Sequence, residues 1–202
     1  MAFFPVYMYH TAMDTIPILD FGSQTTQLIV RRIRDMGVYT EIIPGDSPLP
    51  TRIPGLNMKG IILPRSPKSV NGTGVTPDRA IYDCGLPLLG ICHGLHHMTV
   101  DLGGEVRPLS GHEYGRIGVK IGQSADPRLG AKPEGFATRF LGSFRALAFT
   151  AWMSHGDTIT GLAPGFVQHG TSEFGFPAMV AHESKRVTYD ISSKPPATIE
   201  WE

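Results

Sequence analysis

The first half of the chain alternates short apolar runs with more polar segments that end at glycines. The apolar runs predict buried strands at residues 16–22, 38–44, 58–64 and 86–92. Helices are predicted at residues 23–37, where apolar residues recur at helical spacing, and at residues 76–85 and 93–104; each of the three segments ends at glycine. Because strands that alternate with helices are typical of βαβ units, the pattern predicts an α/β fold with a mostly parallel sheet flanked by helices.

The second half of the chain has a different pattern, in which short strand-like runs are separated by glycine and proline turns. The predicted strands cover residues 115–122, 148–157, 166–172 and 177–183. Residues 187–191 predict one more strand, which we place at an edge of the sheet. Strands without intervening helices are typically antiparallel, so we expect a small antiparallel β section in the C-terminal half.

The composition fits a globular domain and narrows the class of partner. Of the 202 residues, 41% are hydrophobic and 18% are charged, and the formal net charge is zero. A neutral chain gives no electrostatic reason to expect nucleic acid as a partner. No apolar run has the length of a membrane span, and no Lys or Arg precedes Arg31, so we expect neither a membrane anchor nor a signal peptide. Two cysteines make no disulfide framework, which favours the cytoplasm.

Cys92 is the main candidate for chemistry. It lies between Gly90 and Gly94 where a predicted strand meets a predicted helix, which is the layout of a nucleophile elbow. The glycines let neighbouring backbone pack closely around a tight turn, and the start of the helix points N–H groups at the sulfur. Such a position favours the thiolate and stabilises an oxyanion. The same pattern is also typical of a buried structural thiol before a glycine turn.

A metal site is a further alternative, because histidines are dense around this cysteine. His93 and His97 are four residues apart, as are Cys92 and His96, so the members of each pair share a helix face. However, no second cluster of Cys or His has the spacing of metal ligands. We therefore expect no metal in this chain.

Several motifs together resemble the class I glutamine amidotransferases, and more narrowly the glutaminase domain of GMP synthetase. The matching stretches are residues 18–42, 59–63, 85–94, 102–106, 112–116 and 152–157. The resemblance runs from about residue 16 to residue 186 and implies a flavodoxin-like fold. We accordingly expect a loose N-terminal extension at residues 1–15, one amidotransferase domain at residues 16–191 and a divergent tail at residues 192–202.

The resemblance also implies roles for individual residues. Cys92 would attack the side-chain amide of glutamine, and the backbone N–H groups of His93 and Ser66 would stabilise the oxyanion. The residues implied to contact the substrate are His96, Ser154, His155 and Gly156.

The implied partner is an ATP-dependent synthetase that receives the released ammonia and aminates XMP to GMP. This chain has no glycine-rich phosphate loop of the Ser-Gly-Gly-x-Asp-Ser kind. ATP and magnesium would therefore belong to the synthetase, and we expect no cofactor in this chain.

Departures from the family bear on activity. Residues 64–67 read Pro-Arg-Ser-Pro where the family has Ser-Gly-Gly-Pro, and His96 replaces a glutamine that contacts substrate. The family's general base is also missing, because no His-x-Glu follows His182 and residues 192–194 read Ser-Ser-Lys where the histidine is expected. Loss of a general base costs roughly 10²–10⁴ in rate.

The predicted function is therefore a glutaminase component of GMP synthesis with impaired turnover. The alternative is a catalytically inactive or truncated amidotransferase-like module that binds without hydrolysing glutamine. A further hypothesis is an active enzyme with an unfamiliar base, although each candidate also fits a surface or packing histidine. The candidate histidines are His93, His96, His97 and His155.

Overall fold

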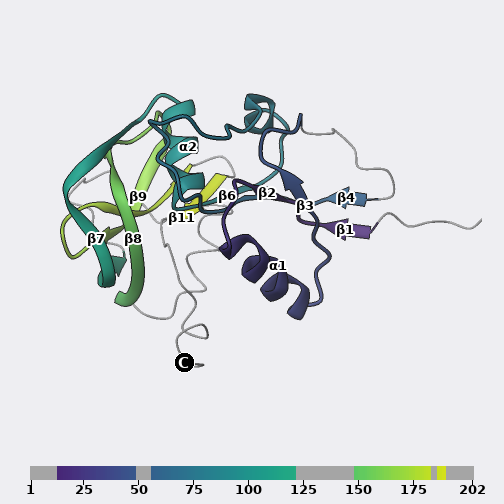
Figure 1. The fold of residues 1–202 in the computed structure, drawn as a ribbon, viewed down its shortest axis with the longest axis horizontal. Helices are drawn as coiled ribbons and strands as arrows, with labels where there is room; N and C mark the ends of the chain where they lie inside the picture. The colour runs from purple at the N-terminus through teal and green to yellow at the C-terminus, as the bar shows by residue number, and fades with distance from the viewer. Residues whose placement is uncertain (1–12, 49–55, 122–147, 183–185, 190–202) are drawn as a thin grey trace, which may run out of the picture.

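The computed structural model describes residues 13–48, 56–121, 148–182 and 186–189. Their main feature is a nine-stranded sheet with the strand order β3-β2-β5-β6-β11-β10-β9-β7-β8 (Figure 1). The strands are β2 (Ile18–Asp20), β3 (Ile42–Pro44), β5 (Ile61–Leu63), β6 (Leu88–Ile91), β7 (Glu105–Ile121), β8 (Ala148–Gly161), β9 (Phe166–Ser172), β10 (Pro177–His182) and β11 (Arg186–Tyr189).

The sheet has a parallel half and an antiparallel half. The strands from β3 to β11 pair in parallel, and those from β11 to β8 pair antiparallel. The predicted α/β fold with an antiparallel section in the C-terminal half is therefore confirmed. The two sections share one continuous sheet, in which β11 is the strand common to both.

The prediction that residues 187–191 form an edge strand is wrong. β11 lies between β6 and β10, with Val187 opposite Leu89 and Tyr189 opposite Ile91 on the parallel side. On the other side the strand runs antiparallel to β10, from which it is separated by a short connection. The apolar pattern of a strand reports which face is buried, but it does not report which strands are its neighbours.

The helices α1 (Thr25–Asp35) and α2 (His93–Asp101) cover opposite faces of the parallel half (Figure 1). Alternating residues of the strands divide between them, because successive side chains point to opposite faces. Ile18 and Ile62 pack in one apolar cluster with Val30 and Ile33 of α1. The cluster on the other face contains Leu19, Ile61, Leu63, Leu88, Leu95 and Met98, of which the last two belong to α2.

The helix predicted at residues 76–85 is a short 3₁₀ helix, η1 (Arg79–Tyr82). It begins where the Asp78 carboxylate accepts a hydrogen bond from the Ala80 N–H at 2.9 Å. Ile81 and Tyr82 are buried and anchor it to the core. Among the described residues no helix has the length and hydrophobicity needed to cross a bilayer.

Residues 13–15 differ from the loose arm that we expected. Met13–Thr15 form strand β1, which pairs in parallel with β4 (Leu56–Met58). Thr15 is fully buried, and its carbonyl accepts a hydrogen bond from the Lys59 N–H at 2.9 Å. The rest of the predicted extension, residues 1–12, and the predicted tail, residues 192–202, lie outside the described residues.

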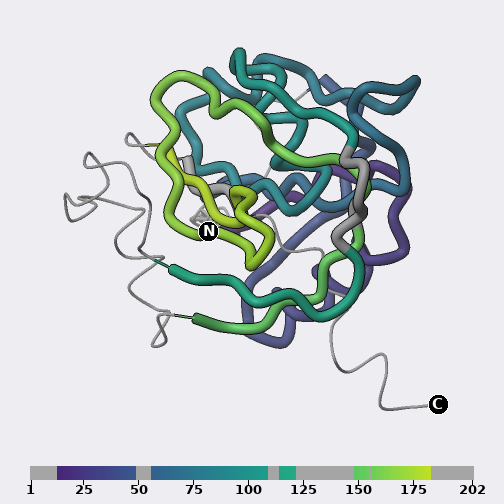
Figure 2. The backbone as a smooth tube through the Cα atoms, turned by 90° about the vertical axis from the view of Figure 1, so that its left-hand side faces the viewer, coloured from purple at the N-terminus to yellow at the C-terminus, as the bar shows by residue number. Residues whose placement is uncertain are grey.

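β7 and β8 form a long antiparallel pair along one side of the molecule (Figure 2). Both exceed the strands predicted at residues 115–122 and 148–157. The glycines and proline that suggested turns are accommodated inside the pair, since the register shifts between Pro108 and Glu113 and Gly115 adopts φ 97°. A glycine at positive φ and a register shift bend a strand without ending its pairing.

Candidate functional site

Cys92 occupies a strained turn between β6 and α2. Its backbone has φ 53° and ψ −110°, and among the described residues it is the only residue other than glycine with a positive φ. Such a conformation is costly for a residue with a Cβ and persists only where the surroundings impose it. The predicted strand-to-helix junction at this cysteine is therefore present in the structure.

The two neighbouring glycines explain how the surroundings impose this turn. A Cβ at Gly94 would lie 2.0 Å from the carbonyl oxygen of Leu63 in β5, and a Cβ at Gly90 would lie 2.7 Å from the nitrogen of Leu95. Both distances are far below van der Waals contact, so only glycine allows α2 to start this close to the sheet. Gly90 and Gly94 thus have the packing expected of elbow glycines.

Cys92 is also the N-cap residue of α2. Its carbonyl accepts the N–H of His96 at 3.0 Å, which closes the first turn of the helix. The N–H groups ahead of that bond have no partner within the helix, and they mark the positive end of its dipole. A helix N-terminus favours the thiolate form of a cysteine. Cys92 is only 4% exposed, so a reagent can reach it only through the cavity beside it.

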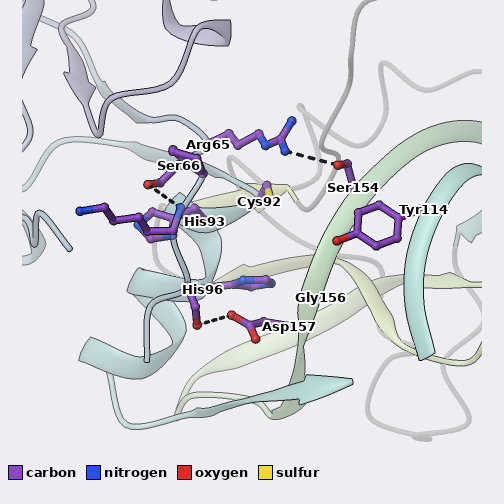
Figure 3. A pocket seen from close by; sticks show the side chains of 12 residues that line it. Arg65, Ser66, Cys92, His93, His96, Tyr114, Ser154, Gly156 and Asp157 are labelled. Carbon is purple, nitrogen blue, oxygen red and sulfur yellow. Dashed lines mark hydrogen bonds between the residues drawn. The ribbon is translucent and has the colours of Figure 1, made fainter. Parts of the chain in front are cut away.

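That cavity has a volume of about 260 Å³ and lies at the ends of β5 and β6 (Figure 3). It brings together most of the predicted site residues, which come from three separate segments of the chain. These lining residues are Ser66, Cys92, His93, His96, Ser154 and Gly156. His155 lies in β8 between Ser154 and Gly156, but its side chain is outside the described part of the structure, so its role stays a prediction.

Other lining residues were not predicted. They are Arg65, Pro67, Lys68, Ser69, Tyr114 and Asp157. Arg65 and Pro67 flank Ser66, while Tyr114 and Asp157 belong to the stretches 112–116 and 152–157 that already stood out as motifs. Membership of those stretches is the signal in the sequence that could have identified Tyr114 and Asp157.

Hydrogen bonds connect the two walls of the cavity. Nη2 of Arg65 donates to Oγ of Ser154 at 3.3 Å, which joins the loop after β5 to β8 (Figure 3). A second link runs from the Ser69 hydroxyl to the Asp157 carboxylate. The loop after β5 is thus held against β8 at two points.

Ser66 is buried, and its hydroxyl fixes the loop in which it lies. Oγ donates to the carbonyl of Phe21 and accepts the N–H of Lys68, both at 3.2 Å. The side chain is therefore used for positioning. Its predicted contribution to an oxyanion site rests on the backbone N–H alone, and the loop keeps ordinary negative φ at Arg65 and Ser66.

His93 belongs to a buried aromatic cluster. Its ring makes edge contacts with Phe21 at 5.6 Å and with His97 at 4.5 Å between ring centroids. Burial holds the pKa of His93 at about 3, and the nearby His97 and His96 act in the same direction against a hydrogen bond to the Lys68 backbone. Burial likewise lowers the pKa of His97. Both rings are therefore neutral at pH 7 and are suited to packing.

The positions of two other parts of the chain bear on the expected lack of a general base. His182 lies opposite Arg186 at the start of β11, and since β11 runs parallel to β6, this is the end of the sheet away from Cys92. β11 ends at Tyr189, opposite Ile91, so the chain leaves it at the same edge as Cys92. Residues 192–194 lie outside the described residues. His96 and His93 are the histidines that line the cavity in the described structure.

The histidines around Cys92 were also considered as metal ligands. Within the described residues, no three His, Cys, Asp or Glu side chains are grouped so as to hold a metal ion. His93 and His97, which share a helix face as expected, contact each other and Phe21 instead.

Comparison with known proteins gives consistent results in sequence and structure. A profile of the family described as "Glutamine amidotransferase class-I" matches residues 17–189. Proteins named "GMP synthase (glutamine-hydrolyzing)" from Bacillus cereus strain AH820 and Bacillus anthracis are each 40% identical over 183 residues, which is 90% of this chain. The chain spans about a third of the length of these relatives, 33% in each case.

Solved structures show the same fold at low sequence identity. A glutamine amidotransferase from Methylobacillus flagellatus matches with a TM-score of 0.64 and 16% identity, over 94% of this chain and 74% of the other. One from Thermotoga maritima matches with a TM-score of 0.58 and 17% identity, over 88% and 74% of the two chains.

Proposed function

Because this chain belongs to the class I glutamine amidotransferase family and is related to the glutaminase part of GMP synthases, we propose that it binds glutamine in the cavity at Cys92 and hydrolyses the side-chain amide slowly. The observation that supports this most strongly is the strained turn at Cys92, which presents a thiol at a helix N-terminus to a cavity. The cavity is small, which suits a single amino acid.

The proposed reaction follows from the position of the sulfur. The Cys92 thiolate attacks the amide carbon of glutamine, and the C–S bond forms as the carbonyl oxygen becomes an oxyanion. The C–N bond then breaks, the nitrogen takes up a proton, and ammonia leaves a thioester. Water attacks that thioester, and glutamate and the free thiol are released. The net reaction is glutamine plus water to glutamate plus ammonia.

The oxyanion would be held by backbone N–H groups. The His93 N–H in the first turn of α2 is one donor in this proposal, and the Ser66 N–H in the loop after β5 is the other. The loop carries Arg65 and Ser66 where the family has glycines, and both keep ordinary φ. A glycine at this position could adopt a backbone conformation that aims its N–H more directly at the oxyanion. We therefore expect the Ser66 N–H to stabilise the oxyanion less than a glycine N–H would.

Slow turnover is proposed because proton transfer lacks its usual group. A pKa of about 3 makes His93 a poor base at pH 7, and His182 lies at the far end of the sheet. His96 lines the cavity and is the described histidine that we propose as a partial substitute. The expected loss is roughly 10²–10⁴ in rate relative to an enzyme with a positioned base.

In the wider reaction, we propose that the ammonia passes to an ATP-dependent synthetase that aminates XMP to GMP. The support is the relation to GMP synthases, of whose length this chain spans 33%. The partner would bind ATP and magnesium, and this chain would need no cofactor for the glutaminase step. We propose the cytoplasm as the compartment, since that is where such a partner and free thiols are expected.

A second candidate function is glutamine binding without turnover. The contact between Arg65 and Ser154 favours it, because the guanidinium occupies one wall of the cavity where the family has a glycine. The two candidates differ in whether glutamate is produced.

Glutamate release from glutamine distinguishes them. The purified chain should release glutamate slowly above the buffer background, with and without an added ATP-dependent synthetase. The release should disappear in Cys92→Ala and persist in the matched variant Cys84→Ala, which alters the other thiol of the chain. No release under either condition would overturn the glutaminase proposal and leave glutamine binding.

A further inference from the structure

Arg65 places a positive charge in the wall of the cavity. The residue is half-buried, and Nη2 donates a hydrogen bond to the neutral hydroxyl of Ser154 at 3.3 Å. Within the described part of the chain, Arg65 forms no ion pair. The acidic residue of the cavity, Asp157, accepts a hydrogen bond from Ser69.

A guanidinium in such a place is better suited to a carboxylate than to a hydroxyl. It presents five N–H donors in a planar fork that matches the two oxygens of a carboxylate, and charge-assisted bonds are shorter and stronger than the one to Ser154. The long hydrogen bond to Ser154 therefore holds the Arg65 side chain in the cavity but gives its positive charge no anionic partner.

We propose that Arg65 binds the carboxylate of the molecule that occupies this cavity, and so determines its specificity. The ligand class is a small amino acid with a free α-carboxylate and an electrophilic carbon that reaches Cys92. As far as it concerns glutamine, this rests on the proposed function. The preference of the cavity for a carboxylate is a separate property and is tested separately.

The placement of the two residues supports this assignment. Arg65 follows β5 and Cys92 follows β6, and because these strands are parallel neighbours, both residues lie at the same edge of the sheet. Both line one cavity of about 260 Å³, so a single small molecule can reach both. Figure 3 shows the Arg65 side chain extending from the Ser66 side of the cavity towards Ser154, with Cys92 on the cavity wall.

The remaining charges of the cavity favour an anion. Lys68 adds a second cation to the lining, and Asp157 is its acidic member. His93 is neutral at pH 7, so it neither adds to nor offsets this balance. Among the described lining residues, a carboxylate entering the cavity therefore meets more positive than negative charge.

Two alkylating reagents of nearly equal size test the proposal. Iodoacetate and iodoacetamide both react when a thiolate attacks the CH₂ carbon, so that a C–S bond forms, the C–I bond breaks and iodide leaves. They differ in carrying a carboxylate or a neutral amide. The rate at Cys92 is measured by mass spectrometry of its peptide, and the rate at half-buried Cys84 in the same sample is the internal reference.

The expected result concerns the ratio of the two rates at Cys92. Arg65→Gln should lower the iodoacetate-to-iodoacetamide ratio about tenfold, the size of one lost charge-assisted hydrogen bond. Arg65→Lys should keep part of the preference, because it keeps the charge and loses the fork. Arg32→Gln, which removes an equal charge from the exposed face of α1, should leave the ratio within about twofold of the unaltered chain.

Other results would overturn the proposal. An unchanged ratio in both Arg65 variants would show that the guanidinium does not meet the carboxylate. If the Arg65 variants slowed alkylation of Cys92 by both reagents equally, the effect of Arg65 would be steric. If Arg32→Gln lowered the rate ratio as much as Arg65→Gln does, the effect would be a long-range effect of charge. Labelling of Cys92 by a glutamine-analogue electrophile tests the proposed function instead. If that labelling failed while the rate ratio still depended on Arg65, the proposed function would be wrong and the inference about Arg65 would hold.

Discussion

Individual atoms set the geometry of the elbow, and Gly94 is the clearest case. The space for its missing Cβ is filled by the backbone of Leu63, which is part of the central sheet and has no freedom to move aside. The position of the helix, and with it the turn at Cys92, therefore depends on the absence of one methyl group. The glycine in the sequence motif indicates this packing requirement, and the position of the Leu63 backbone explains it.

Gly94→Ala is expected to destabilise the fold by about 3 kcal/mol or more, because the added methyl would lie 2.0 Å from the Leu63 carbonyl oxygen. Urea unfolding gives the free energy of unfolding. Gly74→Ala is the matched control, since its Cβ would be 3.8 Å from the nearest side-chain atom of Lys68, and it should change stability by less than about 0.5 kcal/mol. Equal stability of the two variants would contradict this account of the elbow.

The pH dependence of stability tests the buried histidines. The pKa of His93 falls from 6.5 in the unfolded chain to about 3 in the fold, so the unfolded chain binds more protons between these values. Stability should therefore be full above pH 6.5 and decrease as the pH falls towards 3. At about pH 5 the loss from His93 is up to about 2 kcal/mol.

Urea unfolding at about pH 7.5 and about pH 5 measures this loss, and His93→Gln should make it smaller. The variant removes the titrating group and keeps a polar side chain that can still bond to the Lys68 backbone. His97, whose pKa burial also lowers, is expected to account for part of the remaining pH dependence. The same loss of stability in the variant and the unaltered chain would show that His93 is not held neutral.

At the scale of secondary structure, β11 connects the two halves of the sheet. It is short, with four residues, yet it pairs with β6 on one side and β10 on the other. Each N–H along such an interior strand points towards a neighbouring strand. The strand thereby supports β6, which ends at Ile91, immediately before Cys92.

Thr188→Pro should destabilise the fold by about 2–4 kcal/mol, because it removes an interior ladder hydrogen bond and leaves a carbonyl oxygen buried. Urea unfolding is again the measurement. Thr188→Val keeps the backbone N–H and serves as the control. The edge strand β3 naturally ends in Pro44, which fits its lack of a neighbour on one side among the described strands. A Thr188→Pro variant as stable as Thr188→Val would place β11 at an edge.

The sequence indicated the elements better than their arrangement. Helical periodicity located α1, the glycines after residue 102 indicated where α2 ends, and apolar runs located the buried parallel strands. The interior place of β11 and the continuous pairing of β7 were not predictable, because partner choice and tolerated glycines depend on tertiary packing. The pairing of Met13–Thr15 with β4 was not predictable either, because it also depends on tertiary packing.

At the scale of the whole molecule, the sheet collects residues from distant segments at one edge. Cys92, Ser66 and Ser154 were each predicted for the site, and they line one cavity. β5 and β6 are neighbours, and hydrogen bonds from Arg65 and Ser69 hold the loop after β5 against β8. Arg65 was visible as a replaced glycine, but its reach to Ser154 depends on a side-chain direction that sequence does not contain.

The central claim is that Cys92 is an activated nucleophile in a cavity that accepts glutamine. Incubation with 6-diazo-5-oxo-L-norleucine, a glutamine analogue with an electrophilic carbon, tests it most directly by intact mass and peptide mapping. We predict one covalent adduct at Cys92, formed with loss of N₂, slowed by excess glutamine and absent in Cys92→Ala. Failure to label Cys92 while iodoacetamide alkylates it in the same preparation would contradict the claim.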